Sequence, residues 1–272
     1  MSEYAYTEEG TSGERSSGVN RWFFRLLLVV AVILAAELLW LFGITPLLPV
    51  SALDVQGLPG VDRSWILSEA GIGPHSSWIT VNAEEAERRL SRLYLVESAH
   101  VVKEYPDRVR IFLEPRRPAA LILSPVEGRL RPVYLDRHGM IIQIGDTHPE
   151  LESPLALPIL SGFGINNLYL GWRIHILENL LSRLFEIRLA SPELLRAVSE
   201  IRINSKPYSG FDLTLYPVNS GIRFRVEADL DGDILRYIIL MLDVFNKSDV
   251  DVDEVDLRGG TASFVMKEVS SG

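Results

Sequence analysis

The 272-residue chain contains no cysteine, and this absence removes several classes of protein at once. Without thiols there is no disulfide-stapled fold, no zinc site built on cysteine, no iron–sulfur cluster and no thiol nucleophile. The five histidines are scattered, and no two of them stand at the i, i+4 spacing of a helical metal pair. We therefore expect no cofactor and no resident metal ion.

The chain also lacks an excess of basic residues and lacks known catalytic motifs. The chain has 27 Lys and Arg against 36 Asp and Glu, so it lacks the cationic surplus that neutralises phosphates, and no nucleic acid is expected as a partner. The sequence has no G-x-S-x-G, H-E-x-x-H, P-loop or dinucleotide motif. We expect a protein that is not an enzyme and has no small-molecule substrate, although 36 acidic residues leave a paired-carboxylate site open.

One long apolar run, Leu26 to Ile44, lies near the N-terminus and is interrupted by a single charge, Glu37. As a helix it just spans a hydrocarbon core of roughly 30 Å. A cleaved signal peptide is the alternative, but its apolar part is normally only about 7–15 residues long. Residues 21–45 are therefore predicted to form an uncleaved transmembrane helix. The polar residues 1–20 before it are predicted to be a disordered cytoplasmic tail.

Positive charges set the expected orientation of this helix. Arg15, Arg21 and Arg25 precede the run, and the first basic residue after it is Arg63. The positive-inside rule then places the N-terminus in the cytoplasm and the remainder on the exported, periplasmic side of the cell inner membrane. Glu37 has two interpretations, which the sequence leaves open: it faces a partner helix, or it is protonated or snorkels near the outer end of the span.

The exported part is predicted to be α+β, in two domains. Over residues 50–122, capping signals at Asp62 and Asn82 and an alternating hairpin around Tyr105 predict the order β-α-α-β-β. The core of this unit is predicted from one helix face and one strand face: Leu90, Leu93, Val109, Ile111 and Leu113.

Residues 123–267 are predicted to form a C-terminal domain with an antiparallel sheet. Strands are expected over 132–135, 140–144, 211–215, 222–226, 250–257 and 262–267, and helices over 177–185, from 192, and over 234–245. The apolar phase slips between Val252 and Val255, which predicts a β-bulge near residues 253–254.

Several short sequence motifs resemble those of known families. Val96-Glu-Ser-Ala99-His-Val101-Val-Lys103-Glu-Tyr105-Pro106, followed by Val109-x-Ile111-x-Leu113, resembles the signature of POTRA domains. Three later strings resemble landmarks of the bacterial cell-division family FtsQ/DivIB: Leu135-Asp136-x-x-Gly139, Leu157-Pro158-x-Leu160-x-Gly162 and Val255-Asp256-Leu257-Arg258.

The resemblance implies a non-enzymatic scaffold of the divisome. Members of this family bind small bitopic division proteins of the FtsB and FtsL type and link early division proteins to septal cell-wall synthesis. The alternative from a different class is a membrane-anchored exported enzyme acting on cell-wall polymer. An outer-membrane assembly protein also carries POTRA units, but the apolar helical span argues against it.

The partner surface is predicted on the last strand, because an edge strand binds a partner segment by extending the sheet. Ala262, Phe264 and Met266 are expected to point inward and Ser263 and Val265 outward. The candidate partner-binding residues are Arg258, Gly260, Ser263, Phe264, Val265 and Lys267, and the candidate membrane residues are Arg21, Arg25 and Glu37. Internal pairing of this strand is the alternative that remains open.

Acidic residues close to this strand add two further expectations. Asp249, Asp251 and Asp253 form an acidic row, whose ability to hold a weak divalent cation is left open, and which would favour a basic partner. Arg258 could hold an acidic side chain of the partner, as its match to the family implies.

Overall fold

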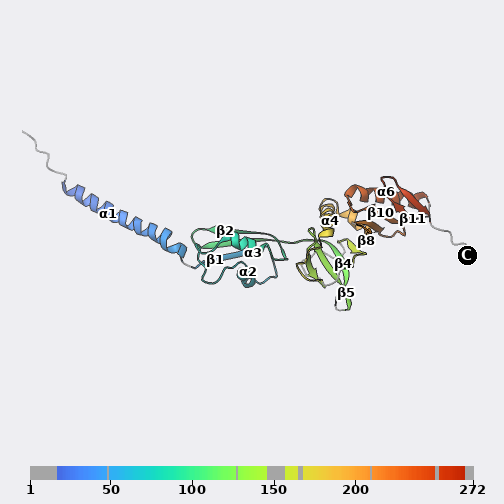
Figure 1. Ribbon diagram of the computed structural model, residues 1–272. Coiled ribbons are helices and arrows are strands. Elements are labelled where there is room, and N and C mark those ends of the chain that lie inside the picture. The colour runs from blue at the N-terminus through green and yellow to red at the C-terminus, as the bar shows by residue number, and fades with distance from the viewer. Residues whose placement is uncertain are drawn as a thin grey trace, which may run out of the picture. The chain divides into compact units, whose positions relative to one another are not determined.

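The computed structural model describes residues 17–47, 49–126, 128–145, 157–164, 168–208, 210–248 and 251–266 (Figure 1). The chain divides into two compact units. One contains the chain up to residue 87 together with 100–112, and the other contains 88–99 together with the chain from residue 113.

The N-terminal helix α1 covers Ser17–Leu39 and continues as a π turn, Trp40–Ile44, and a 3-10 turn, Thr45–Leu47. By length and composition, Trp22–Ile44 is able to cross a membrane. Arg25 lies within this segment, as it does within the predicted helix 21–45. The helix also starts four residues inside the segment expected to be disordered, because each residue added to a nucleated helix gains a backbone hydrogen bond. Arg15 lies outside the described residues.

A three-stranded sheet with the order β1-β3-β2 follows α1. Its elements are β1 (Ala52–Gln56), α2 (Arg63–Glu69), α3 (Ala83–Leu90), β2 (Val96–Glu104) and β3 (Arg108–Pro115). This is the β-α-α-β-β order that the sequence predicts, and β1 lies parallel to β3.

Capping and burial in this part follow the sequence pattern. The Asp62 carboxylate accepts a hydrogen bond from the Ser64 N–H at 3.0 Å, and the Asn82 amide oxygen accepts one from the Glu85 N–H at 3.1 Å. Four of the five predicted core side chains are buried, namely Leu90, Val109, Ile111 and Leu113, and Leu93 is half-buried.

The second sheet has nine strands in the order β12-β11-β10-β9-β8-β7-β4-β5-β6. The strands are β4 (Pro118–Val126), β5 (Arg129–Asp136), β6 (Ile141–Ile144), β7 (Ile159–Ser161), β8 (Val198–Ser205), β9 (Phe211–Pro217), β10 (Arg223–Glu227), β11 (Val252–Asp256) and β12 (Ser263–Met266).

This sheet differs from the prediction in two respects. Strands β4, β7 and β8 were not expected, and the predicted domain boundary after residue 122 falls inside β4. The sheet is also mixed, because β7 pairs in parallel with β4 and β8, and β10 pairs in parallel with β11. The helix after β10 returns the chain to the end of the sheet at which β10 began. The next strand, β11, therefore runs parallel to β10.

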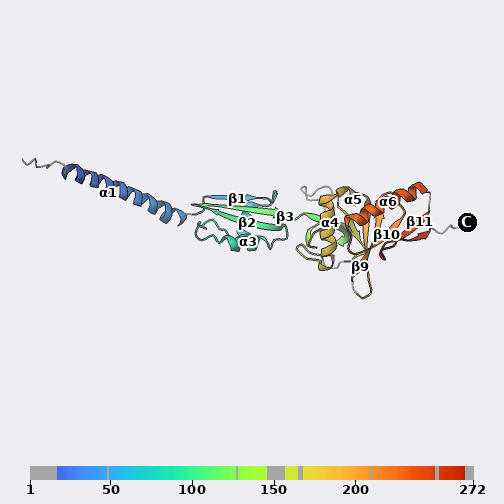
Figure 2. The same cartoon turned by 90° about the horizontal axis from the view of Figure 1, so that it is seen from above.

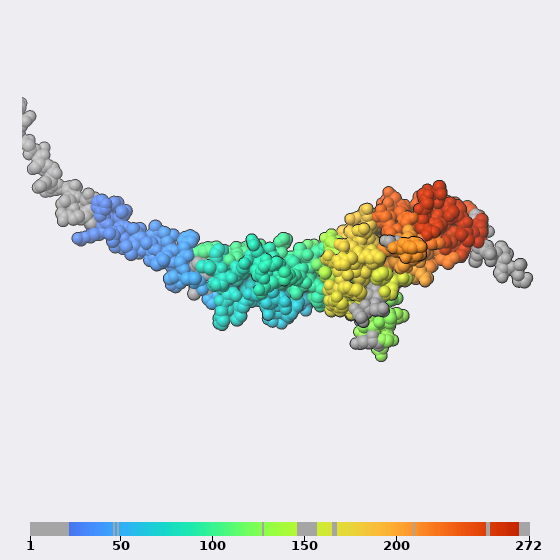
Figure 3. All heavy atoms as spheres, in the orientation of Figure 1, coloured from blue at the N-terminus to red at the C-terminus, as the bar shows by residue number. Residues whose placement is uncertain are grey.

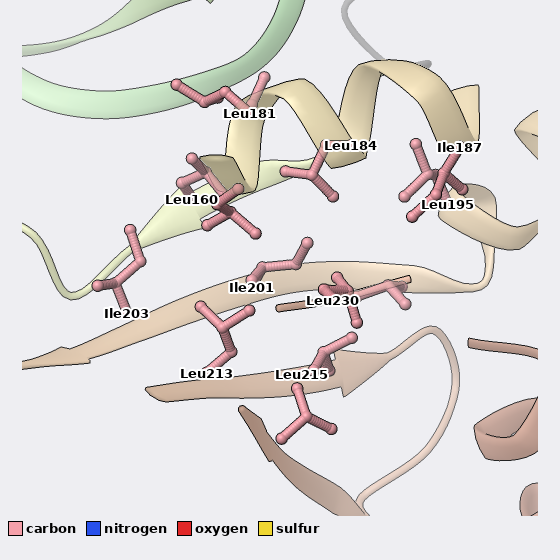
Figure 4. Packing of buried hydrophobic residues seen from close by; sticks show 14 of the residues in the cluster. Leu160, Leu181, Leu184, Ile187, Leu195, Ile201, Ile203, Leu213, Leu215 and Leu230 are labelled. Atoms are coloured by element: carbon pink, nitrogen blue, oxygen red, sulfur yellow. The ribbon is translucent and has the colours of Figure 1, made fainter. Parts of the chain in front are cut away.

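Helices α4 (Glu178–Ala190), α5 (Pro192–Arg196) and α6 (Gly232–Ser248) pack against this sheet (Figure 2). Figure 4 shows Leu181 and Leu184 of α4 near Leu160 of β7, above Ile201 of β8 and Leu213 of β9. Their apolar side chains form one continuous core, which fixes the strands at the C-terminal end of the sheet.

Candidate partner-binding site

Strand β12 is the terminal strand of the nine-stranded sheet. It pairs antiparallel with β11, from Asp256 opposite Ser263 to Val252 opposite Met266. Within the described ranges, no strand pairs with its other edge. The outward N–H and C=O groups of β12 are therefore available to a partner strand.

The side chains of β12 are more exposed than the alternation predicts. Phe264 packs edge-on against Phe245 of α6, with the ring centroids 5.8 Å apart, yet it is 49% exposed. Met266 was also expected inward and is 61% exposed, beside the expected outward Val265 at 56%. A terminal strand has a neighbour on one side only, which leaves its inward residues only partly covered. Lys267 lies outside the described residues.

The predicted bulge in β11 is confirmed. The register with β12 shifts between Val252 and Glu254, which leaves Asp253 as the extra residue. Val252 and Val255 are both buried in the core as a result. The bulge thus holds β11 in the sheet and presents β12 at its border.

Arg258, the second residue after β11, binds two carboxylates of its own chain. Its Nε and Nη2 groups donate to Asp256 at 2.9 and 2.5 Å, and its Nη1 group donates to the buried Asp212 of β9 at 2.5 Å. The hydrogen bond from Arg258 lowers the pKa of Asp256 to about 2, and the same bond raises the pKa of Arg258. This network holds the loop between β11 and β12.

The guanidinium of Arg258 still has capacity for a partner. A guanidinium carries five N–H donors, and the contacts to Asp212 and Asp256 leave some of them over. The side chain is 27% exposed. Partner binding by Arg258 stays a prediction, now with a structural role beside it.

A polar pocket of about 380 Å³ lies next to Arg258 and the start of β12. Lys206, which follows β8, lines this pocket and lies 3.3 Å from Glu227. Lys206 was not predicted from the sequence, because only the pairing of distant strands brings it near Arg258. The other lining residues are Glu227, Asp256, Arg258, Gly259, Thr261 and Ser263.

The loop between β11 and β12 contains Gly259 and Gly260. Gly260 has a φ of 73°, in the left-handed region that side chains other than glycine rarely adopt. The Gly260 conformation lets the chain turn back into β12. Figure 3 shows the C-terminal part of the second unit, coloured orange to red, as part of the molecular surface.

The predicted acidic row is only partly available to a partner. Asp251 is exposed, but Asp253 forms an ion pair with Arg223, and Glu254 lies 3.7 Å from Arg225. The parallel register places Arg223 opposite Glu254 and Arg225 opposite Asp256, so β10 supplies the neutralising charges. Asp249 lies outside the described residues.

The three candidate membrane residues all lie on α1. Arg25 and Glu37 are exposed on the helix and stand within the span, and Arg21 precedes it by one position. A partner helix at Glu37 stays a prediction.

Comparisons with known proteins agree with the family resemblance that the sequence motifs indicate. Residues 48–116 match the family model of the FtsQ-type POTRA domain. The cell division protein DivIB of Bacillus anthracis is 24% identical over 197 residues, which cover 72% of this chain and 67% of that protein. The cell division protein FtsQ of Zymomonas mobilis is 31% identical over 126 residues, 46% of this chain and 37% of that protein.

A second FtsQ and one solved structure are also similar. The cell division protein FtsQ of Mycolicibacterium smegmatis is 28% identical over 128 residues, 47% of this chain and 35% of that protein. The structure is the major extracytoplasmic domain of the trans isomer of DivIB from Geobacillus stearothermophilus. It has 17% identity, a TM-score of 0.32, and coverage of 49% of this chain and 97% of that one. From its domain and its relatives, the chain carries an FtsQ-type POTRA domain and is related to the bacterial cell-division proteins FtsQ and DivIB.

Proposed function

We propose that this protein is a non-enzymatic, membrane-anchored scaffold of the divisome that binds small bitopic division proteins of the FtsB and FtsL type. Its relatives named FtsQ and DivIB support a role in cell division. In this role it links early division proteins to septal cell-wall synthesis. Arg21, directly before the span, and Arg25, in its first turn, support a cytoplasmic N-terminus and exported domains.

The observation that carries the proposal is the position of β12 at the border of the sheet. A partner segment adds to this strand as a tenth strand, and main-chain hydrogen bonds supply most of its affinity. The exposed side chains of Val265 and Phe264 give the partner apolar contacts on both faces of the extended sheet. Beside them, the pocket at Arg258 and Lys206 accepts an acidic side chain of the partner.

Proline substitution tests the strand addition, because proline removes one backbone donor. Consecutive N–H groups of a strand face opposite edges, so of Phe264→Pro and Val265→Pro one removes a donor toward β11 and the other a donor toward the partner. We expect the variant that loses the donor toward the partner to abolish co-purification of the small bitopic partners with the full chain. The melting temperature should stay nearly unchanged, since β12 is exposed.

Val265→Thr is the matched control, because threonine keeps the branched shape and the N–H group. Binding should be close to normal in this variant. If both proline variants are folded and still bind the partners, strand addition at β12 is wrong and the interface lies on another surface of the chain.

A further inference from the structure

The end of the membrane span contacts the turn between β2 and β3 directly. The Tyr105 hydroxyl donates to the Leu41 carbonyl, and the Tyr105 ring stacks on Phe42 with the centroids 5.7 Å apart and the planes at 23°. Trp78 meets the other side of this cluster edge-on, 5.7 Å from Tyr105. The last residues of the span and the tip of the hairpin therefore share one aromatic cluster.

Backbone hydrogen bonds fix two more segments at the same place. The N–H of Val50 donates to the Ser76 carbonyl at 2.9 Å, and Pro49 pairs with Ser77. The N–H of Ser51 donates to the Asp107 carbonyl at 3.1 Å. We call residues 49–51, 76–80 and 105–107 together the apex.

The contacts set the depth of the apex relative to the span. The span ends at Ile44, and Leu41 lies three residues before that end, which is about 4–5 Å along a helix axis. Tyr105 touches Leu41 and Phe42, so its ring lies level with the last turn of the span. The zone between hydrocarbon and water is the zone that aromatic side chains favour.

The surface around the apex is apolar where it is exposed. Ile79 is 54% exposed at the apex, and Leu47, just after the span, is 64% exposed. Trp40 and Phe42 at the end of the span are 59% and 63% exposed. These side chains continue the apolar surface of α1 onto the folded unit, as an interfacial contact with lipid requires.

Three charged residues near the apex, Asp107, Glu104 and Lys103, contact other groups of the chain. Asp107 accepts a hydrogen bond from the Ser51 hydroxyl, and Glu104 lies 2.6 Å from Arg110. Lys103 lies over the Trp78 ring, 4.5 Å from its centroid, and donates to the Val81 carbonyl at 2.8 Å. Because these charges are satisfied internally, bringing the apex to a lipid surface leaves them paired.

We propose that the apex is a membrane-docking surface, with Ile79 and Tyr105 inserted among the lipid headgroups of the leaflet in which the span ends. The occupant is the bilayer itself, argued from the continuity of the apex with the apolar surface of α1. This docking rests on the span lying in a membrane and is independent of partner binding at β12. It holds the first folded unit against the membrane instead of letting it swing on a linker.

Site-directed spin labelling tests this depth directly, because the chain has no native cysteine. Single cysteines are placed at Ile79, at Leu47 and at Gln56, and the full chain is reconstituted into lipid nanodiscs. Collisions of each nitroxide with oxygen, which concentrates in lipid, are compared with collisions with a water-soluble nickel chelate. We expect oxygen to dominate at Ile79→Cys and Leu47→Cys.

Gln56→Cys is the matched control on the same unit. Strand β1 starts beside the apex, and Gln56 stands four residues farther along it, which is about 13 Å toward water. The nickel chelate should dominate there. Adding Tyr105→Ser to Ile79→Cys should shift the Ile79 label toward nickel. If Leu47→Cys is embedded but Ile79→Cys is as accessible to nickel as Gln56→Cys, the span is intact and the docking proposal is wrong.

Discussion

Two arginine–aspartate networks in the second unit use the same chemistry in different surroundings. Arg116 donates to Asp136 at 2.7 Å, and the exposed fractions of the two side chains are 8% and 0%. Arg258 donates to Asp256 at 2.5 Å, and each of these side chains is 27% exposed. The first pair is part of the interior, whereas the second opens onto a pocket beside a sheet edge.

The surroundings of Asp136 and of Arg258 explain why these residues stand in two of the sequence motifs that resemble the family. Asp136 also accepts the N–H groups of His138 and Met140, at 2.9 and 2.7 Å, which closes a turn. In that turn Gly139 has a φ of 77°, and a Cβ there would lie 2.6 Å from the Ile174 carbonyl oxygen. The string with Asp136 is therefore explained by folding alone, whereas the string with Arg258 has donors left for a partner.

The largest expected effect comes from breaking the buried pair. Arg116→Met leaves the Asp136 carboxylate buried with only backbone donors, which should cost about 3–5 kcal/mol of the free energy of unfolding. Denaturant unfolding of the full chain measures this loss. A loss as small as that of a surface pair, about 0.5 kcal/mol, would show that the two networks do not differ as proposed.

At the exposed pair we expect a smaller loss of stability than at the buried pair, together with a loss of partner binding. Arg258→Gln removes the donor that Asp212 receives, and should cost about 1–3 kcal/mol. Co-purification of the bitopic partners should fall at the same time.

The double variant Arg258→Gln with Asp212→Asn separates the two roles of Arg258. An amide pair restores a neutral hydrogen bond, so stability should recover while binding stays low. If binding recovers together with stability, Arg258 acts only as a structural residue and the comparison between the networks fails.

The smallest effect is expected in the pH dependence of stability. The pKa of Asp256 is about 2 in the folded chain, below its ordinary value of 3.8, because Arg258 donates to its carboxylate. A lowered folded pKa stabilises the protein above pH 4, and this contribution is lost as the pH falls from about 4 to about 2. The contribution should amount to about 1–2 kcal/mol at neutral pH.

Unfolding of the native chain and of Asp256→Asn measures this contribution across the same pH range. The native chain should be the more stable of the two at pH 5, and the difference should shrink as the pH approaches 2. A difference that does not change with pH would show that Arg258 does not lower the pKa of Asp256.

Short-range signals in the sequence determined many of the elements. A long apolar run predicted α1, and apolar periodicity predicted α4 and α6. Polar residues at Asp62 and Asn82 predicted where two helices start. The hairpin of β9 and β10 and the bulge at Asp253 followed from the alternation of side chains. These features depend on residues a few positions apart, whose spacing the sequence records directly.

Tertiary structure decided which strand lies where and what it meets. Strand β7 has three residues, too few for a period, and β4 is a nearly continuous buried run without alternation. The pairing of Arg258 with Asp212 and the approach of Lys206 to the pocket beside Arg258 join positions 46 or more residues apart. The terminal place of β12 depends on the order of all the strands in the sheet. Contacts of this kind arise from the packing of the whole sheet, which residue spacing along the chain does not encode.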